Sequence, residues 1–335
     1  MKKIMNSGAT VVEEMISGFV KAYSDSYERI DGLNAILYKK RRRGKVSLVI
    51  GGGAGHEPLF SGFCGDGAAD AAVSGNVFAA PNPQLILETA KAVDEGYGVL
   101  FVYGNYAGDN LNFDMAEELC ELEGIKTAHV RVWDDLASAP KERITDRRGI
   151  AGDVFVIHIA AAACDAGLPL EEVVRIAEKA RDSISTIGLA TAPGTHPVTG
   201  EHTFELPDDA IEYGMGLHGE PGVERTSMRP ADELTERMYS EIMAEMRLEK
   251  GTEIAALVNS LGATTIMELC IVYNKLEELI KEDGLRVHDC ELKCFCTCQE
   301  MSGFSITFLR LDDELKRYYD TPVGTPYYAR GAIEK

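Results

Sequence analysis

The chain has 335 residues, of which 45% are hydrophobic and 26% are charged, the composition of an ordinary globular protein rather than a disordered or fibrous one. With 34 Lys and Arg against 54 Asp and Glu, its formal net charge is −20, which disfavours nucleic acid and anionic membranes as partners. The sequence has neither a membrane-length apolar stretch nor the apolar core of a signal peptide. We therefore expect a cytoplasmic protein of about two domains.

The first half of the chain alternates between two hydrophobic patterns. The first ~30 residues have apolar side chains at helical spacing, and the same spacing returns at residues 83–95, 112–123 and 170–181. Short apolar runs typical of buried strands occur at residues 45–50, 98–103, 127–132 and 154–159. This alternation predicts an α/β fold with a mostly parallel sheet covered by helices on both faces. Ligands bind such sheets beyond the carboxyl ends of the strands.

The composition shifts to Gly, Thr and Pro near residues 185–203, which indicates a domain boundary. We place a first α/β domain at residues 1–184 and a second α/β domain at residues 185–335. The second half has predicted helices at 231–249 and 265–282 and predicted strands at 253–258, 286–298 and 304–310.

Four of the eight cysteines cluster near the end of the chain, at Cys290, Cys294, Cys296 and Cys298. A metal site is one interpretation. However, residues 292–298 alternate like a strand, in which the last three sulfurs would be spaced ~6.6 Å apart along one face. Tetrahedral zinc binding would require that strand to break. We therefore interpret these cysteines as small side chains on a buried strand face, reduced in the cytoplasm, and we predict no metal site.

The first unusual loop, residues 51–58, reads Gly-Gly-Gly-Ala-Gly-His-Glu-Pro and directly follows a predicted strand. No Gly-Lys-Ser/Thr follows, so it is not a Walker phosphate loop, and His56 stands where a dinucleotide loop needs its third glycine. A glycine turn whose histidine caps a helix is the structural alternative. Because four glycines are entropically costly unless something fits against them, we favour a ligand-binding loop.

Two further loops contain polar groups in similar surroundings. In residues 104–113 Asp109 precedes a predicted helix, which it could simply cap. In residues 214–222 His218 has glycines nearby on both sides, so its ring is accessible, and a neutral imidazole can act as base or nucleophile. The other five histidines have no such setting and receive no role: His129, His158, His196, His202 and His288.

In this order and spacing, the three loops resemble the substrate-binding K subunit (DhaK type) of dihydroxyacetone kinases. The resemblance extends to Met1-Lys2-Lys3-Ile4, to Arg147-Arg148-Gly149-Ile150-Ala151, to residues 257–264, and to Cys296-Thr297 with residues 301–307. It therefore covers essentially the whole chain, and a set of matches this long is far more specific than any one motif.

The resemblance implies a role for each matched residue. His218 would add to the ketone carbonyl through a ring nitrogen and hold the substrate as a covalent hemiaminal, which glycerol cannot form. Asp109 would accept a proton from the terminal hydroxyl, and His56 would be a second acid/base group. The backbone that contacts the substrate would be that of Gly53, Ala54 and Gly55.

The resemblance also implies partners. A separate L-type subunit would carry ATP or ADP with Mg²⁺, so this chain would bind no cofactor itself, and a phosphocarrier M subunit could supply the phosphoryl group. A homodimer is implied as well. Whether the phosphoryl source is phosphoenolpyruvate or ATP stays open.

The chain departs from the family at two places. Gly104 stands where the family has a Lys that reaches the substrate, and Ala79-Ala80 replaces two hydroxyl residues before Pro81. Two polar contacts are lost and space is expected to be gained. Either the substrate is a longer ketose such as a four-carbon erythrulose, or the chain is a ketone-sensing paralogue or co-activator. A nicotinamide oxidoreductase is excluded by the glycine spacing of the first loop.

Overall fold

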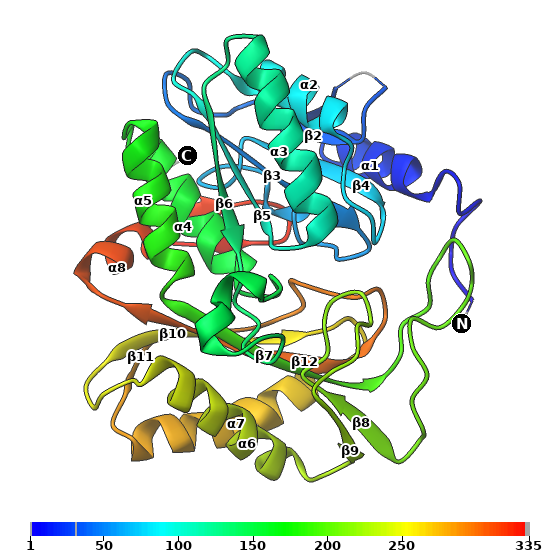
Figure 1. Ribbon diagram of the computed structural model, residues 1–335, viewed down its shortest axis with the longest axis vertical. Helices are drawn as coiled ribbons and strands as arrows, with labels where there is room; N and C mark the ends of the chain where they lie inside the picture. Colours follow the sequence, from blue (N-terminus) through cyan, green and yellow to red (C-terminus); the bar gives the residue numbers. More distant parts are fainter. Residues whose placement is uncertain (1, 31, 332–335) are drawn as a thin grey trace.

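The computed structural model describes residues 2–30 and 32–331 as two six-stranded sheets with helices packed on them (Figure 1). The first sheet has the order β1-β2-β4-β3-β5-β6. Its strands are β1 (Tyr27–Arg29), β2 (Ala35–Tyr38), β3 (Ser47–Ala54), β4 (Ala71–Val77), β5 (Val99–Gly104) and β6 (Thr127–Val132). Strands β4, β3, β5 and β6 run parallel, while β1 and β2 form an antiparallel edge. The predicted mostly parallel sheet is thereby confirmed.

The central strands have apolar side chains on both faces, which explains why helices cover both faces of this sheet. On β3, Leu48 and Ile50 point into a core shared with α1 (Val11–Ala22) and α4 (Asp153–Asp165). Val49 points the other way, toward α2 (Pro83–Val93) and α3 (Ala107–Leu122). Successive side chains of a strand face opposite sides, so a strand that is apolar throughout needs cover on both.

The second sheet has the order β11-β10-β12-β7-β8-β9 and is mostly antiparallel. Its strands are β7 (Ile184–Ala192), β8 (Ala210–Tyr213), β9 (Glu224–Ser227), β10 (Glu253–Ser260), β11 (Arg286–Lys293) and β12 (Ser302–Leu311). Helices α6 (Ala231–Met246) and α7 (Ile266–Glu282) cover one face, at the bottom of Figure 1. The remaining elements are α5 (Leu170–Arg181), α8 (Asp313–Tyr319), the short 3-10 helices η1 (Ser61–Phe63) and η2 (Lys141–Asp146), and the pair β13 (Val323–Gly324) and β14 (Ala329–Arg330).

The other face of the second sheet shares a core with the first half of the chain. Ala255 and Leu257 of β10 belong to the same apolar cluster as α4 and the inner face of β3. Helix α4 is therefore covered on both sides, and its residues from Asp153 to Cys164 are all buried. The predicted strand at 154–159 is wrong for this reason: a helix buried all round shows the same unbroken apolar run as a buried strand.

Other sequence predictions need smaller corrections. The N-terminal helix ends at Ala22 and is followed by β1, so it does not fill the first 30 residues. Strand β11 ends at Lys293, and residues 294–298 form a loop in which Cys296 and Cys298 are buried while Cys294 is exposed. The predicted strand face of three cysteines is therefore wrong.

The side chain of Asn259 explains why the strand stops. Its amide donates to the backbone oxygen of Cys296 at 2.7 Å and accepts from the backbone nitrogens of Phe295 and Cys296 at 2.9 and 3.0 Å. These three bonds satisfy backbone groups that a strand would have paired with its neighbour.

The predicted boundary after residue 184 falls at the first residue of β7, between the two sheets, and stays a prediction. In the described part of the chain, no helix has the length and apolar character needed to cross a membrane.

Candidate active site

The three loops singled out in the sequence meet at one small cavity. His56 follows β3, Asp109 lies in the first turn of α3 just after β5, and His218 lies in the loop after β8. The cavity has a volume of about 20 Å³, room for about one water molecule. It is lined by Gly52, Gly53, His56, Leu59, Phe60, Gly104, Tyr106, Asp109, Gly149, Asp153, Leu217 and His218.

His218 is held in a single orientation by Glu220. The Nδ1 of His218 lies 2.9 Å from Oε1 of Glu220, and the backbone nitrogen of His218 donates to Oε2 at 2.8 Å. Burial raises the pKa of Glu220, but the hydrogen bonds and charge of His218 prevail and lower that pKa to about 2. An ionised carboxylate can only accept a hydrogen bond, so Nδ1 carries a proton and Nε2 is the atom available for chemistry.

His56 is held in the same way by a backbone carbonyl. Its Nδ1 donates to the oxygen of Thr297 at 2.7 Å, its ring is 3% exposed, and its Nε2 lies 3.1 Å from Nε2 of His218. Burial, followed by the nearby charge of His218, lowers the pKa of His56 to about 3. With both Nδ1 atoms protonated, the 3.1 Å contact is a hydrogen bond only if one further proton lies between the two Nε2 atoms.

Asp109 lines the cavity, and one of its carboxyl oxygens has no partner in the described part of the chain. It is 9% exposed, and its Oδ1 has no hydrogen-bond partner among the described residues. Burial raises the pKa of Asp109 to about 6, although the charge of His218 opposes the rise. The helix α3 begins at Ala107, earlier than predicted, so Asp109 lies inside its first turn rather than before it. A carboxylate there could take up a proton near neutral pH.

The space beside the glycines of the first loop is occupied mainly by the protein's own atoms. A Cβ on Gly52 would lie 2.5 Å from the ring of Phe60, and one on Gly53 would lie 2.8 Å from the backbone nitrogen of Ala79. Gly55 has a φ of 108° and would clash with Phe78. Close packing therefore accounts for these glycines. Gly53 lines the cavity, whereas Ala54 and Gly55 do not appear in its wall.

Gly104 does not leave the open space predicted from the sequence. A Cβ at this position would lie 3.3 Å from Oδ2 of Asp153, 3.4 Å from the Tyr106 ring and 3.5 Å from the oxygen of Gly149. The carboxyl group of Asp153, which sequence reasoning left without a role, occupies this side of the cavity.

Sequence reasoning also missed two residues that orient the histidines, Glu220 and Thr297. Glu220 stands two residues after His218, so the His-x-Glu spacing was a usable signal. Thr297 lies 241 residues from His56 and meets it only through the fold. For Asp153 the signal was a charged residue at the head of an unbroken apolar run.

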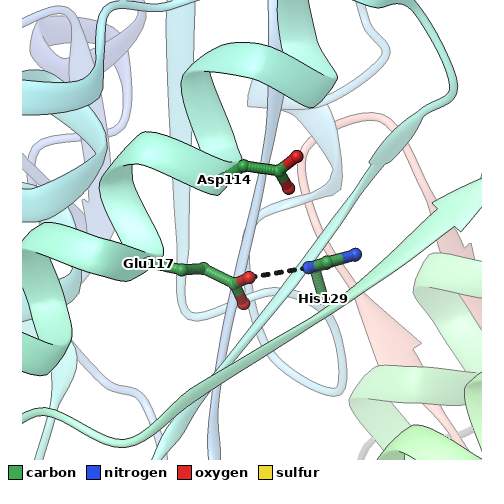
Figure 2. A group of neighbouring side chains, drawn as sticks. All are labelled: Asp114, Glu117 and His129. Atoms are coloured by element: carbon green, nitrogen blue, oxygen red, sulfur yellow. Dashed lines mark hydrogen bonds and ion pairs between the residues drawn. The ribbon is translucent and has the colours of Figure 1, made fainter.

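A second group of polar side chains lies outside the cavity. Figure 2 shows Glu117 pointing at His129, with Asp114 beside them, and their ligand atoms lie within 4.8 Å of one another. Asp114 is already ion-paired with Arg131, whose positive charge opposes a cation there. A larger hollow of about 760 Å³ between α5, α8 and the ends of β10 and β12 is lined by mixed charges and contains none of the three loops. We assign neither a role.

Comparisons with known proteins identify the family of this chain. The family model described as the Dak1 domain matches residues 17–327. The chain belongs to the Dak1 family. Its resemblance to DhaK-type subunits is also confirmed: it is 42% identical to the dihydroxyacetone-binding subunit DhaK of PTS-dependent dihydroxyacetone kinase 2 from Listeria innocua, over 98% of this chain and 99% of that one.

Two further similar proteins carry names that describe different functions. An L-erythrulose kinase of Pectobacterium atrosepticum is 36% identical over 99% of this chain, which spans 57% of that kinase. The solved structure of a dihydroxyacetone kinase operon co-activator, DhaQ, superposes with a TM-score of 0.87 and 28% identity, over 92% of this chain and 96% of that one. The two-domain α/β fold predicted from the sequence is therefore that of the Dak1 family.

Proposed function

We propose that this chain is the substrate-binding subunit of a short-ketose kinase and that His218 holds the ketone as a hemiaminal. The observation that carries the proposal is the orientation of His218: Glu220 fixes Nδ1, and Nε2 faces a cavity that also contains His56 and Asp109. The similarity to DhaK subunits and to an erythrulose kinase supports a ketose of three or four carbons as substrate.

The two histidines provide the proton that hemiaminal formation needs. The proton between the two Nε2 atoms first moves to Nε2 of His56, which leaves a lone pair on Nε2 of His218. Nε2 of His218 then adds to the carbonyl carbon, the C–N bond forms as the C=O π bond breaks, and His56 gives the proton to the carbonyl oxygen. His218 is left as a substituted imidazolium with a proton on Nδ1, and its charge is balanced by Glu220. An alcohol has no carbonyl carbon to attack, so glycerol is rejected by its reactivity.

Asp109 would then act on the hydroxyl to be phosphorylated. With a pKa of about 6 it is mostly ionised at neutral pH and can accept the hydroxyl proton as the oxygen attacks the phosphoryl group. We propose that ATP or ADP and Mg²⁺ are bound by an L-type partner subunit, with a phosphocarrier M subunit as a second partner, and that the chain acts as a cytoplasmic homodimer. The PTS-dependent name of the Listeria relative supports such partners.

A ketone-sensing co-activator is the second candidate, because the structural similarity to DhaQ is high. Such a protein would also use His218 to bind a ketone. It has less use for a general base, so the presence of both Asp109 and His56 in the cavity favours the kinase subunit.

A crystal soaked with dihydroxyacetone tests the covalent step. We expect electron density that is continuous from Nε2 of His218 to the ketose, and ligand bound elsewhere with His218 unmodified would contradict the proposal. Phosphoryl transfer in the presence of an L-type subunit then separates the two candidates. Adduct formation without any transfer would favour the sensor.

A further inference from the structure

The wall of the cavity opposite the glycine loop contains a buried carboxyl group that the mechanism does not use. Asp153 is the first residue of α4, is 1% exposed and lines the same cavity as His218. Its Oδ1 is buried and has no hydrogen-bond partner among the described residues, nor does any Lys or Arg in this part of the chain form an ion pair with it. An unpaired buried carboxyl normally destabilises a fold, so its presence calls for a ligand.

A structural role for Asp153 is already performed by a neighbour. Asp134 accepts hydrogen bonds from the backbone nitrogens of Ile150 and Gly152, both at 2.7 Å, and so holds the chain where it enters α4. Asp153 makes no side-chain bond of this kind. The two aspartates are equally deep, at 2% and 1% exposure, and differ in whether their oxygens are satisfied.

The surroundings of Asp153 indicate the chemistry of its partner. Burial, reinforced by the negative charges of Asp134 and Asp109, raises the pKa of Asp153 well above its usual value. A protonated carboxyl group can donate one hydrogen bond and accept another, which matches a hydroxyl group and not an anion. Gly104 places no side chain next to Oδ2 of Asp153, where a Cβ would lie 3.3 Å away.

We propose that Asp153 binds a hydroxyl group of the ketose other than the one that is phosphorylated, and so makes the site specific for ketones with hydroxyls on both sides of the carbonyl. This inference rests on the proposed function, because His218 fixes the carbonyl carbon and Asp109 takes the reacting hydroxyl. The remaining hydroxyl then meets Asp153 beside Gly104.

Calorimetric titration of the full chain with dihydroxyacetone and with hydroxyacetone, which lacks one hydroxyl, tests the inference without a partner subunit. We expect the wild type to bind dihydroxyacetone more tightly, and Asp153→Ala to reduce the ratio of the two affinities on the order of tenfold or more. Asp153→Asn keeps a donor and an acceptor and should retain most of the ratio. An unchanged ratio in Asp153→Ala would overturn the inference.

Asp134→Asn is the matched control, with the same residue type at the same depth but hydrogen-bonded to the backbone. It should lower the melting temperature and leave the ratio unchanged, whereas Asp153→Ala should leave the melting temperature unchanged or raise it. A lowered melting temperature in Asp153→Ala together with an unchanged ratio would assign Asp153 a structural role. If the wild type binds neither ketone, the proposed function fails; if it binds both equally, only the inference about Asp153 fails.

Discussion

Four buried aspartates of this protein fall into two groups that differ in their partners. Around the entry to α4, Asp134 accepts backbone N–H groups and Asp135 is paired with Arg148 at 2.8 Å. In the cavity, Asp109 and Asp153 each have an Oδ1 without a partner in the described chain. Burial raises the pKa of all four, but only Asp134 and Asp135 have both carboxyl oxygens hydrogen-bonded by the protein. The comparison shows that burial alone does not distinguish the aspartates of the cavity, because what they share is a carboxyl oxygen without a partner in the described chain.

The largest effect is expected when His218, on the cavity side of this comparison, is replaced. His218→Ala should abolish both the ketose adduct and phosphoryl transfer, because the proposed adduct forms on the ring nitrogen that this change removes. Mass spectrometry under native conditions and a coupled transfer assay measure the two losses. His129→Ala provides a control outside the cavity and should leave both intact. Full transfer by His218→Ala would contradict covalent binding.

Asp109→Asn should come next and separates binding from catalysis. Removing a general base costs about 10²–10⁴-fold in turnover, whereas the ketose should still bind to His218. In the wild type the base is the ionised form, so turnover should fall as the pH drops below about 6. A pH–rate profile of both proteins with the partner supplied measures this. Equal loss of binding and rate would assign Asp109 a positioning role.

Replacing Asp109 should change the stability of the fold in the opposite direction to replacing Asp134. Its folded-state pKa is raised, so it favours folding most at low pH and destabilises the protein as the pH rises through about 6. Asp109→Asn should therefore raise the melting temperature at neutral pH, unlike Asp134→Asn. A lower melting temperature in Asp109→Asn would contradict the proposed difference between the two groups of aspartates.

Glu220→Gln should have a smaller effect, about tenfold, on adduct formation. The amide can still accept from Nδ1 of His218, but the negative charge that balances the imidazolium adduct is lost. The affinity for dihydroxyacetone should be measured at several pH values. We expect it to be lower in Glu220→Gln and to depend differently on pH. Glu117→Gln, whose carboxylate contacts His129 at 2.8 Å, is the matched control. An affinity equal to that of the wild type at every pH would show that Glu220 does not support the adduct.

The smallest effect concerns Gly104. We predict that a four-carbon ketose is used at least as well as dihydroxyacetone and that Gly104→Lys shifts the ratio of kcat/KM a few-fold toward three carbons. The Lys side chain would begin 3.3 Å from Oδ2 of Asp153 and would cover or pair with that carboxyl. A wild-type ratio that strongly favours dihydroxyacetone and does not respond to the Lys would show that Gly104 does not determine specificity.

Patterns of neighbouring residues predicted much of this molecule, because short-range spacing along the chain determines where most helices and strands form. The helices over residues 83–95 and 170–181 follow from apolar spacing, and His218 stood out because of its glycine neighbours. Helix α4 was assigned wrongly because burial under two sheets removes the amphipathic pattern. Residue pairs such as His56 with Thr297 depend on contacts between distant segments, which no local pattern records.

The burial of α4 under both sheets joins the two halves of the chain through one core. Moving the sheets apart would expose large side chains such as Val154, Phe155 and Ile157, at about 1.5–3 kcal/mol each, a large fraction of the 5–15 kcal/mol that typically stabilises a whole domain. Separating the two sheets is therefore costly in free energy. Leu217, beside His218, and Ala54, two residues before His56, belong to the same core, so the packing around α4 also holds the two histidine loops together.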